Sequence, residues 1–190
     1  MSASIGPLRQ ADAMEPSALA RDINQTCRLR GEFRLRSGQS ATEYFDKYLF
    51  KSQPDLLRRV AEAMVPLLPH GTELLGGLEL GGVPVATMVS SLTGLPALFV
   101  RKQAKTYGTC RLAEGAEVRG RRVTLIEDVI TTGGAVRDAT MSLRQAGAAV
   151  GVVVCAIDRS EPGANRLAEI GIKTLSVLTK ADLDSSATCS

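Results

Sequence analysis

The chain has 190 residues, of which 44% are hydrophobic and 23% are charged, and its formal net charge is +3. This composition is typical of a globular protein with an ample core, and the charge is too small to indicate a nucleic-acid-binding protein. A slight positive balance suits a protein whose ligands are anions. No run approaches the ~18 apolar residues of a membrane span, and residues 1–20 lack a signal-peptide core. We therefore expect a cytoplasmic protein with neither a nucleic-acid partner nor a membrane partner.

The predicted elements follow one another as short apolar runs and helical segments. Residues 1–14 are expected to be flexible, and residues 15–190 to form a single domain. Residues 31–50 hold most of the phenylalanines and tyrosines and a Ser-Gly turn, which predicts a strand pair that caps one edge of a sheet. Further strands are predicted at residues 73–78, 97–100, 122–127, 150–157 and 173–178. Helices are predicted near residues 54–68, 83–93, 135–147 and 161–170.

Several of these strands, such as the one at residues 150–157, are apolar throughout and do not alternate with polar residues. A strand has this pattern when helices cover both faces of its sheet. The sequence therefore predicts an α/β fold with a doubly wound, mostly parallel sheet and helices on both faces. The four cysteines lie far apart and form no CxxC motif, so neither a zinc site nor a disulfide framework is indicated.

The stretch VTLIEDVITTGGAVRD, residues 123–138, combines an apolar run with two acids, two threonines and two glycines. Ligands of doubly wound sheets bind at the carboxyl ends of the strands, which is where this run would deliver the chain. Residues Thr131, Thr132, Gly133 and Gly134 would form a turn that opens a helix near Ala135. Free backbone N–H groups, threonine hydroxyls and the helix dipole would there bind a phosphate.

The two acids, Glu127 and Asp128, would repel that phosphate. They would accept hydrogen bonds from vicinal hydroxyls, or hold a magnesium ion through water. A ribose 5-phosphate satisfies both halves of the motif. Neither GxxxxGK[ST] nor a GxGxxG after a strand occurs in the sequence. The alternative is a strand-to-helix turn that simply needs glycines, with two solvated acids at its rim.

The segment LIEDVITTGGAV resembles the phosphoribosyl-pyrophosphate motif of the type I phosphoribosyltransferases. Over residues 31–183 the resemblance extends to the orotate phosphoribosyltransferases. GEFRLRSG and YFDKYLF resemble that family's hood, a small N-terminal subdomain, and GGLELGGVPVAT its pyrophosphate-side loop. VRKQAKTYG resembles its mobile catalytic loop, and AIDRSEPG the segment with its base-binding arginine. The resemblance implies the type I fold with a small hood, and the conversion of orotate and phosphoribosyl pyrophosphate, with Mg²⁺, into orotidine 5′-monophosphate and pyrophosphate.

The chemistry of this reaction suits the basic stretch VRKQAKTYGTCR, because the enzyme must neutralise a departing polyanion. With its glycines the stretch could close as a lid over pyrophosphate; the alternative is a solvated loop. By resemblance the catalytic residues are Lys105, Asp128 and Glu127. Phosphoribosyl pyrophosphate would contact Arg36, Arg101, Lys102, Lys105, Tyr107, Glu127, Asp128, Val129, Ile130, Thr131, Thr132, Gly133, Gly134 and Ala135. The family's loop reaches into the neighbouring subunit, which implies a homodimer whose loops act in trans.

Orotate carries a carboxylate, which a planar arginine can bind with two hydrogen bonds. The resemblance assigns this role to Arg159, with Thr131, Tyr44 and Phe45 as further orotate contacts. For Arg159 the alternative is an ion pair with Asp158, and for the two aromatic residues it is a place in the core.

Two positions depart from the family pattern. Tyr107 stands where a histidine is common, and Gly81 where many members have a lysine. A tyrosine can donate a hydrogen bond to pyrophosphate but does not carry positive charge near neutral pH. Two alternatives to orotate chemistry follow: a phosphoribosyltransferase for another base, such as a purine, and a regulator that binds phosphoribosyl pyrophosphate without catalysis.

Overall fold

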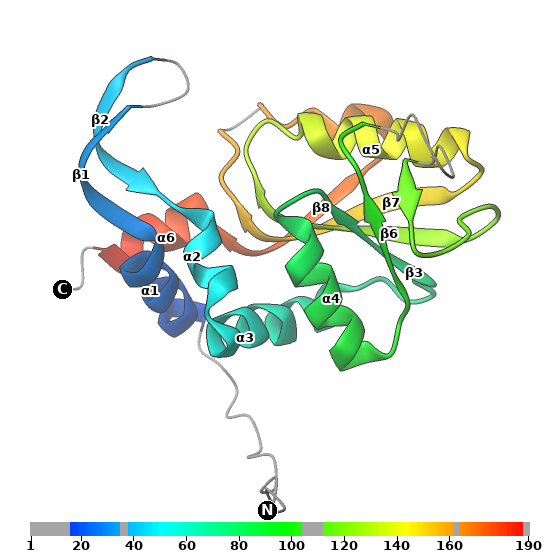
Figure 1. Ribbon diagram of the computed structural model, residues 1–190, viewed down its shortest axis with the longest axis horizontal. Coiled ribbons are helices and arrows are strands. Elements are labelled where there is room, and N and C mark those ends of the chain that lie inside the picture. The colour runs from blue at the N-terminus through cyan, green and yellow to red at the C-terminus, as the bar shows by residue number, and fades with distance from the viewer. Residues whose placement is uncertain (1–15, 35–37, 104–111, 162–163, 188–190) are drawn as a thin grey trace, which may run out of the picture.

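A six-stranded sheet forms the centre of the computed structural model, which describes residues 16–34, 38–103, 112–161 and 164–187 (Figure 1). The strand order is β5-β4-β3-β6-β7-β8. Five strands run parallel, and only the short β5 is antiparallel to its neighbour β4. The bounds are β3 Leu74–Leu78, β4 Ala97–Val100, β5 Ala113–Glu114, β6 Arg122–Ile130, β7 Ala149–Asp158 and β8 Lys173–Thr179. The prediction of a mostly parallel sheet is confirmed.

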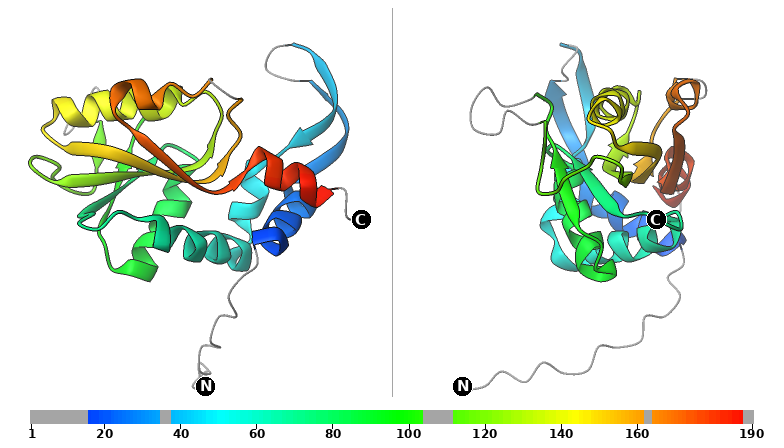
Figure 2. Two further views of the ribbon diagram at one scale, coloured as in Figure 1. Left: turned by 180° about the vertical axis from the view of Figure 1, so that it is seen from behind. Right: turned by 90° about the vertical axis from the view of Figure 1, so that its right-hand side faces the viewer.

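Helices cover both faces of this sheet. Helices α3 (Pro54–Met64) and α4 (Gly82–Thr93) lie on one face, and α5 (Gly134–Gln145) lies on the other (Figures 1 and 2). Successive side chains of a strand point to opposite faces. Accordingly Ile126 of β6 belongs to the core under α3 and α4, and its neighbour Leu125 to the core under α5. The doubly wound arrangement thus explains why the strands are apolar throughout.

The first and last helices of the described chain pack against each other. Helix α1 (Pro16–Cys27) lies beside α6 (Lys180–Ala187) in both Figure 1 and Figure 2. The amide of Asn24 donates hydrogen bonds to the Leu183 carbonyl and, at 2.7 Å, to the Ser186 hydroxyl. Neither helix was predicted from the sequence. No helix in the described part of the chain has the length and apolar character of a membrane span.

A hairpin stands apart from the central sheet (Figure 1). Its strands β1 (Arg28–Arg34) and β2 (Ser40–Phe45) pair antiparallel in a sheet of their own. The predicted strand pair is therefore present, but it does not extend an edge of the central sheet. It also ends at Phe45, because Asp46 caps helix α2 (Lys47–Ser52) by accepting a 2.9 Å hydrogen bond from the Tyr48 backbone N–H.

Three other predictions require correction. The helix predicted near 161–170 is only a short 3₁₀ turn, η2 (Leu167–Ile170), because Asn165 Oδ1 accepts a 3.0 Å hydrogen bond from the Leu167 backbone N–H in place of a helical bond. The helix predicted over 54–68 ends at Met64, and the 3₁₀ turn η1 (Val65–Leu67) follows it. The strand predicted at 122–127 continues to Ile130, so Asp128 as well as Glu127 lies inside it.

Candidate active site

The turn between β6 and α5 presents free helix N–H groups at the carboxyl edge of the sheet. Gly133 is the N-cap of α5 and has φ +72°, a left-handed conformation that favours glycine. A β-carbon at this position would also meet the Leu167 side chain at 3.0 Å. Since glycine brings no capping side chain, the first N–H groups of this twelve-residue helix can bind an anion.

A cavity of about 330 Å³ lies in front of this turn. It brings together the N-terminus of α5 and that of α4, whose N-cap is Gly81. The cavity is lined by Lys47, Tyr48, Glu79, Leu80, Gly81, Lys102, Glu127, Val129, Ile130, Thr131, Thr132, Gly133, Gly134, Ala135 and Val136. The structure therefore gathers most of the predicted phosphoribosyl-pyrophosphate residues that it describes around one space.

The beginning of α4 is pressed against strand β6. A β-carbon at Gly82 would overlap the Ile126 carbonyl oxygen, and one at Gly81 would overlap the Asp128 carboxylate. In β3, a β-carbon at Gly77 would lie 2.7 Å from that of Ala86. At each of these positions the space that a side chain would need is filled by a neighbouring backbone or side-chain atom. The glycine that replaces the common lysine at position 81 therefore lies where this structure leaves no room for a side chain.

Asp128 is fully buried and paired with two lysines of helix α2. Lys47 Nζ lies 3.0 Å from Oδ1, and Lys51 Nζ forms an ion pair with Oδ2. The Lys51 side chain is only 3% exposed. Glu127 is also buried, and its Oε1 accepts a 3.0 Å hydrogen bond from the Asp128 backbone N–H. The expected acid pair is thus present, but Asp128 is covered by cations and does not itself line the cavity.

These contacts separate the pKa values of the two acids. Burial and the neighbouring Asp128 raise the pKa of Glu127 well above its ordinary value. Burial acts to raise the pKa of Asp128 as well, but hydrogen bonding with Glu127 and the charges of Lys51 and Lys47 outweigh it, so this pKa is lowered. Near neutral pH, Asp128 is therefore the ionised acid that can accept hydrogen bonds from hydroxyls.

The two lysines also differ in pKa. Burial acts to lower the pKa of Lys47, but attraction to Asp128 outweighs it and the pKa is raised. For Lys51 burial prevails, and the pKa is lowered. Neither lysine was predicted as a site residue. Two lysines four residues apart are typical of an exposed helix face, so the local sequence gives no signal for this role.

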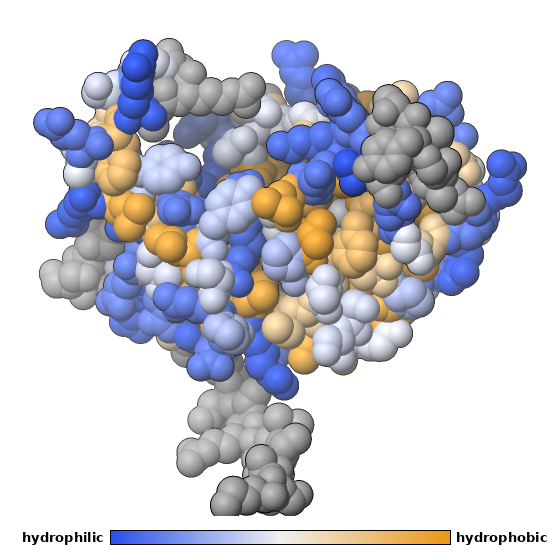
Figure 3. Space-filling view, viewed as in Figure 1, coloured by the Kyte–Doolittle hydropathy of each residue, from blue (hydrophilic) through white to orange (hydrophobic). Residues whose placement is uncertain are grey.

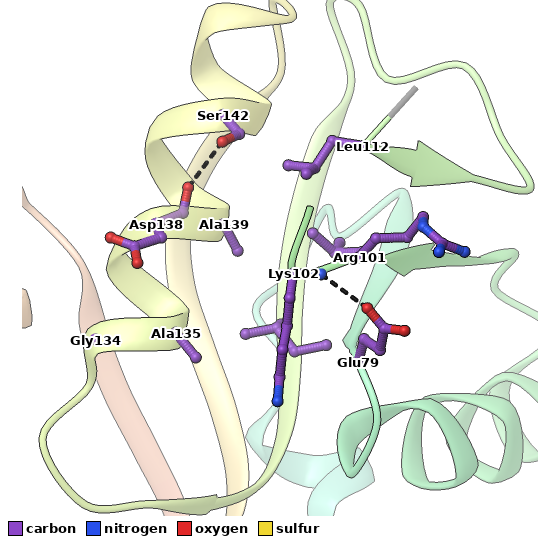
Figure 4. A pocket seen from close by; sticks show the side chains of 11 residues that line it. Glu79, Arg101, Lys102, Leu112, Gly134, Ala135, Asp138, Ala139 and Ser142 are labelled. Carbon is purple, nitrogen blue, oxygen red and sulfur yellow. Dashed lines mark hydrogen bonds between the residues drawn. The ribbon is translucent and has the colours of Figure 1, made fainter. Parts of the chain in front are cut away.

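A second cavity of about 400 Å³ adjoins the first (Figure 4). The two share Glu79, Lys102, Gly134 and Ala135. Glu79 accepts a 2.9 Å hydrogen bond from the Lys102 backbone N–H, which ties the start of the predicted lid to the end of β3. The Arg101 guanidinium points away from Gly134 and Ala135 in Figure 4, and the described residues give its Nε no hydrogen-bond partner. Lys105, Tyr107 and Arg36 lie outside the described residues.

Two of the predicted orotate contacts, Arg159 and Phe45, meet at the end of β7. The Arg159 guanidinium carbon lies 4.8 Å from the centre of the Phe45 ring, a cation–π contact between the hood and the sheet. The Arg159 backbone N–H donates a 2.8 Å hydrogen bond to the Ile130 carbonyl, beside the phosphate turn. Asp158 accepts hydrogen bonds from Ser160, and no ion pair with Arg159 is found among the described residues. Tyr44 is 44% exposed and contacts Phe33 instead.

Comparison with known proteins shows that the chain is similar to orotate phosphoribosyltransferases. It is 72% identical over 168 residues to the orotate phosphoribosyltransferase of a Nocardioides species, covering 88% of this chain and 94% of that protein. The Mycobacterium tuberculosis orotate phosphoribosyltransferase bound to inorganic phosphate superimposes with a TM-score of 0.78 at 31% identity, over 89% of this chain and 98% of the other. The structure of that enzyme with phosphoribosyl pyrophosphate has a TM-score of 0.74 at 29% identity, with the same coverage. No family model matches the chain.

The parallel sheet, its two helical layers and the strand–turn–helix cradle are those of the type I phosphoribosyltransferases. Within that class, the 72% identity to an orotate phosphoribosyltransferase, over 94% of that protein, identifies the family. The chain belongs to the orotate phosphoribosyltransferase family.

Proposed function

We propose that the protein transfers the 5-phosphoribosyl group from phosphoribosyl pyrophosphate to orotate, giving orotidine 5′-monophosphate and pyrophosphate, as a step of pyrimidine (UMP) biosynthesis. One observation carries the proposal: two helix N-termini open onto a single cavity, and the buried acid Asp128 lies between them. A ligand with a phosphate at one end, a diphosphate at the other and a diol between them matches this order of groups. Orotate, the substrate for which the related enzymes are named, supplies the base.

In this proposal the α5 turn binds the 5-phosphate through the backbone N–H groups of residues 131–135, with help from the threonine hydroxyls. Asp128 accepts hydrogen bonds from the ribose hydroxyls, since its lowered pKa keeps it ionised. As the bond to the diphosphate breaks, negative charge grows on the leaving group. Lys102, which lines both cavities, and the lid residues Arg101 and Lys105 would stabilise it.

The residues of this site fit magnesium only when the ion binds together with the substrate. No group of three or more potential metal-ligating side chains occurs in the described part of the chain. Mg²⁺ often keeps several waters and binds through one or two carboxylates and substrate phosphates. Glu127 and Asp128 could accordingly hold water-bound magnesium brought in by the diphosphate, where the ion would offset negative charge on the leaving group.

Arg159 would bind the orotate carboxylate, with Phe45 against the base. Its backbone is fixed beside the phosphate turn by the hydrogen bond to Ile130, so the base site and the ribose site share one edge of the sheet. The contact with Phe45 already holds the guanidinium beside the ring that would lie against the base, and a planar guanidinium suits a planar carboxylate.

We further propose a homodimer in which the lid acts in trans. Arg101 supports this arrangement, since its guanidinium points away from the cradle of its own chain (Figure 4). Tyr48 and Leu80 are 47% and 59% exposed, and Figure 3 shows an apolar area over the start of α4 with hydrophilic residues around it. A cytoplasmic location is also proposed, supported by the buried free thiols of Cys27 and Cys155, which suit a reducing compartment.

The direct test is a substrate panel. Purified protein with Mg²⁺ and phosphoribosyl pyrophosphate should consume orotate and release pyrophosphate, and should act poorly on uracil, which lacks the carboxylate. Consumption of adenine, guanine or hypoxanthine in place of orotate would make the protein a purine enzyme. Binding of phosphoribosyl pyrophosphate without consumption with any base would make it a regulator.

A further inference from the structure

Lys47 covers the acid on which the proposed reaction depends. It is the first residue of α2, and its Nζ lies 3.0 Å from Asp128 Oδ1. The Asp128 side chain is 0% exposed, whereas the Lys47 side chain is 36% exposed and lines the 330 Å³ cavity. A ligand in this cavity can therefore reach the Asp128 carboxylate only after the Lys47 ammonium has moved.

Lys51 occupies a different position in the same cluster. It lies one helical turn beyond Lys47, holds the other oxygen of Asp128 and does not line the cavity. Because Lys51 binds Asp128 independently, the carboxylate keeps a buried counter-ion when Lys47 departs. Of the two lysines, Lys47 is thus the one that can move without leaving a buried charge unpaired.

Lys47 is one of two cations on the same carboxylate. Lys47 contacts Oδ1 of Asp128, and Lys51 contacts Oδ2. Of these two lysines, only Lys47 lines the cavity. A cation whose departure leaves Asp128 still paired with Lys51 therefore lies at the wall of the cavity.

This cation lies beside the N-terminus of α4. Gly81, the N-cap of that helix, is so close to Asp128 that a β-carbon there would overlap the carboxylate. The loop before α4 offers the cavity an acid, Glu79, and no basic side chain. Of the two described lysines that line this cavity, Lys47 and Lys102, Lys47 is the one paired with the carboxylate beside this helix end.

We propose that Lys47 is a further substrate-binding residue, which leaves Asp128 when the ribose hydroxyls donate to that carboxylate and then contacts the diphosphate at the N-terminus of α4. The proposal rests on the proposed function. In this exchange the ion pair between Lys47 and Asp128 is replaced by one between Lys47 and the diphosphate. Asp128 is therefore uncovered only for a ligand that carries an anionic group for Lys47 to bind. Lys51 remains in place as the fixed counter-ion of Asp128.

The test compares two ligands in the Lys47→Met variant. Equilibrium dialysis with Mg²⁺ should show that phosphoribosyl pyrophosphate binds roughly 10- to 100-fold more weakly, the loss typical of a charged hydrogen-bonded contact. Orotidine 5′-monophosphate, which lacks the diphosphate, should bind at least as tightly as it does to the wild type, because its ribose no longer has to displace Lys47 from Asp128. Lys47→Arg retains a cation and should recover much of the lost affinity. Lys173→Met removes the same charge at the amino end of β8, away from the cavity, and should leave both affinities unchanged.

Three outcomes would decide against Lys47. These are unchanged binding of phosphoribosyl pyrophosphate by folded Lys47→Met, an equal loss for both ligands, or no recovery with Lys47→Arg. If Lys47→Met does not fold, Lys47→Gln keeps a hydrogen-bond donor for Asp128 without the charge and should show the same selective loss. Failure of the proposed function is distinct, because the wild type itself would then not consume orotate.

Discussion

Lys51 and Asp128 form a buried ion pair that joins helix α2 to strand β6 across 77 residues of sequence. The pair connects the segment that follows the hairpin to the strand that leads into the phosphate turn. We expect Lys51→Met to destabilise the fold by about 3 kcal/mol, because the Asp128 charge then relies on the partly exposed Lys47 alone. Denaturation by urea would measure this loss. Lys51→Met combined with Asp128→Asn should recover part of it, and the same stability in Lys51→Met as in the wild type would disprove the coupling.

The raised pKa of Glu127 predicts how stability depends on pH. Burial and Asp128 cause the folded state to keep a proton on Glu127 above pH 4.5, the ordinary value at which the unfolded chain loses it. The contribution of Glu127 therefore falls as pH rises from 4.5 towards the folded-state pKa. Glu127→Gln cannot ionise, so its stability relative to the wild type should increase over this range. Urea unfolding of both proteins at a series of pH values measures the difference, and a constant difference would contradict the prediction.

The close approach of α4 to β6 predicts different outcomes for two glycines. Gly82→Ala should destabilise the protein by about 2–4 kcal/mol, because its β-carbon would overlap the backbone carbonyl of Ile126 and the helix must move. Gly151→Ala adds the same methyl group in β7, where nothing lies within 4 Å and φ is ordinary. It should leave the thermal unfolding midpoint unchanged or raise it. Equal effects of the two substitutions would show that α4 can shift at no cost.

Base recognition can be tested at Arg159. Arg159→Ala should raise the KM for orotate by roughly 10- to 100-fold and leave the KM for phosphoribosyl pyrophosphate almost unchanged. The preference for orotate over uracil should become smaller, because uracil has no carboxylate that Arg159 could bind and so loses no contact in the variant. Phe45→Leu, which removes the ring under the guanidinium, serves as a control for positioning and should have a smaller effect. Steady-state kinetics would measure the KM values for both substrates. An unchanged KM for orotate would show that Arg159 does not bind the base.

Action of the lid in trans predicts complementation between inactive variants. Lys105→Ala should lose its leaving-group cation, and Asp128→Asn its ionised ribose acceptor, so each homodimer should be nearly inactive. A mixed dimer would contain one site in which both residues are intact. Purified heterodimers carrying two different tags should therefore recover up to about half of the wild-type activity, one of two sites. Heterodimers as inactive as their parents would indicate sites formed by single chains.

Sequence patterns predicted most of the central fold because local residues determine it. The apolar run before Glu127 is long enough to identify β6, and the glycines that follow identify the turn before α5. The end of β6 was placed too early, since two acids are unusual inside a strand and only their tertiary partners make them tolerable there. The short turn η2 was extended into a helix because LAEI has helical character by itself.

The part of the site that escaped prediction depends on contacts between distant segments. Lys51 reads as a surface residue in FDKYLFKS, and its burial follows from the position of Asp128 on another element. The position of Lys47 over Asp128 is likewise not indicated by the residues around it in the sequence. Gly81 could be identified as a departure from the family, but only the structure shows that the carboxylate fills the space beside it.

The contact between α1 and α6 has a consequence for the order in which the protein folds. Asn24 is synthesised early, and its partner Leu183 lies 159 residues later in the chain. Closing so long a loop costs entropy before any contact repays it, and contacts of large sequence separation slow folding. During translation the side of α1 that packs against α6 therefore stays uncovered until nearly all of the chain has been made, while α2 and α3 can already cover another side. We expect the α1–α6 contact at the base of the hairpin to be a late-forming part of the molecule.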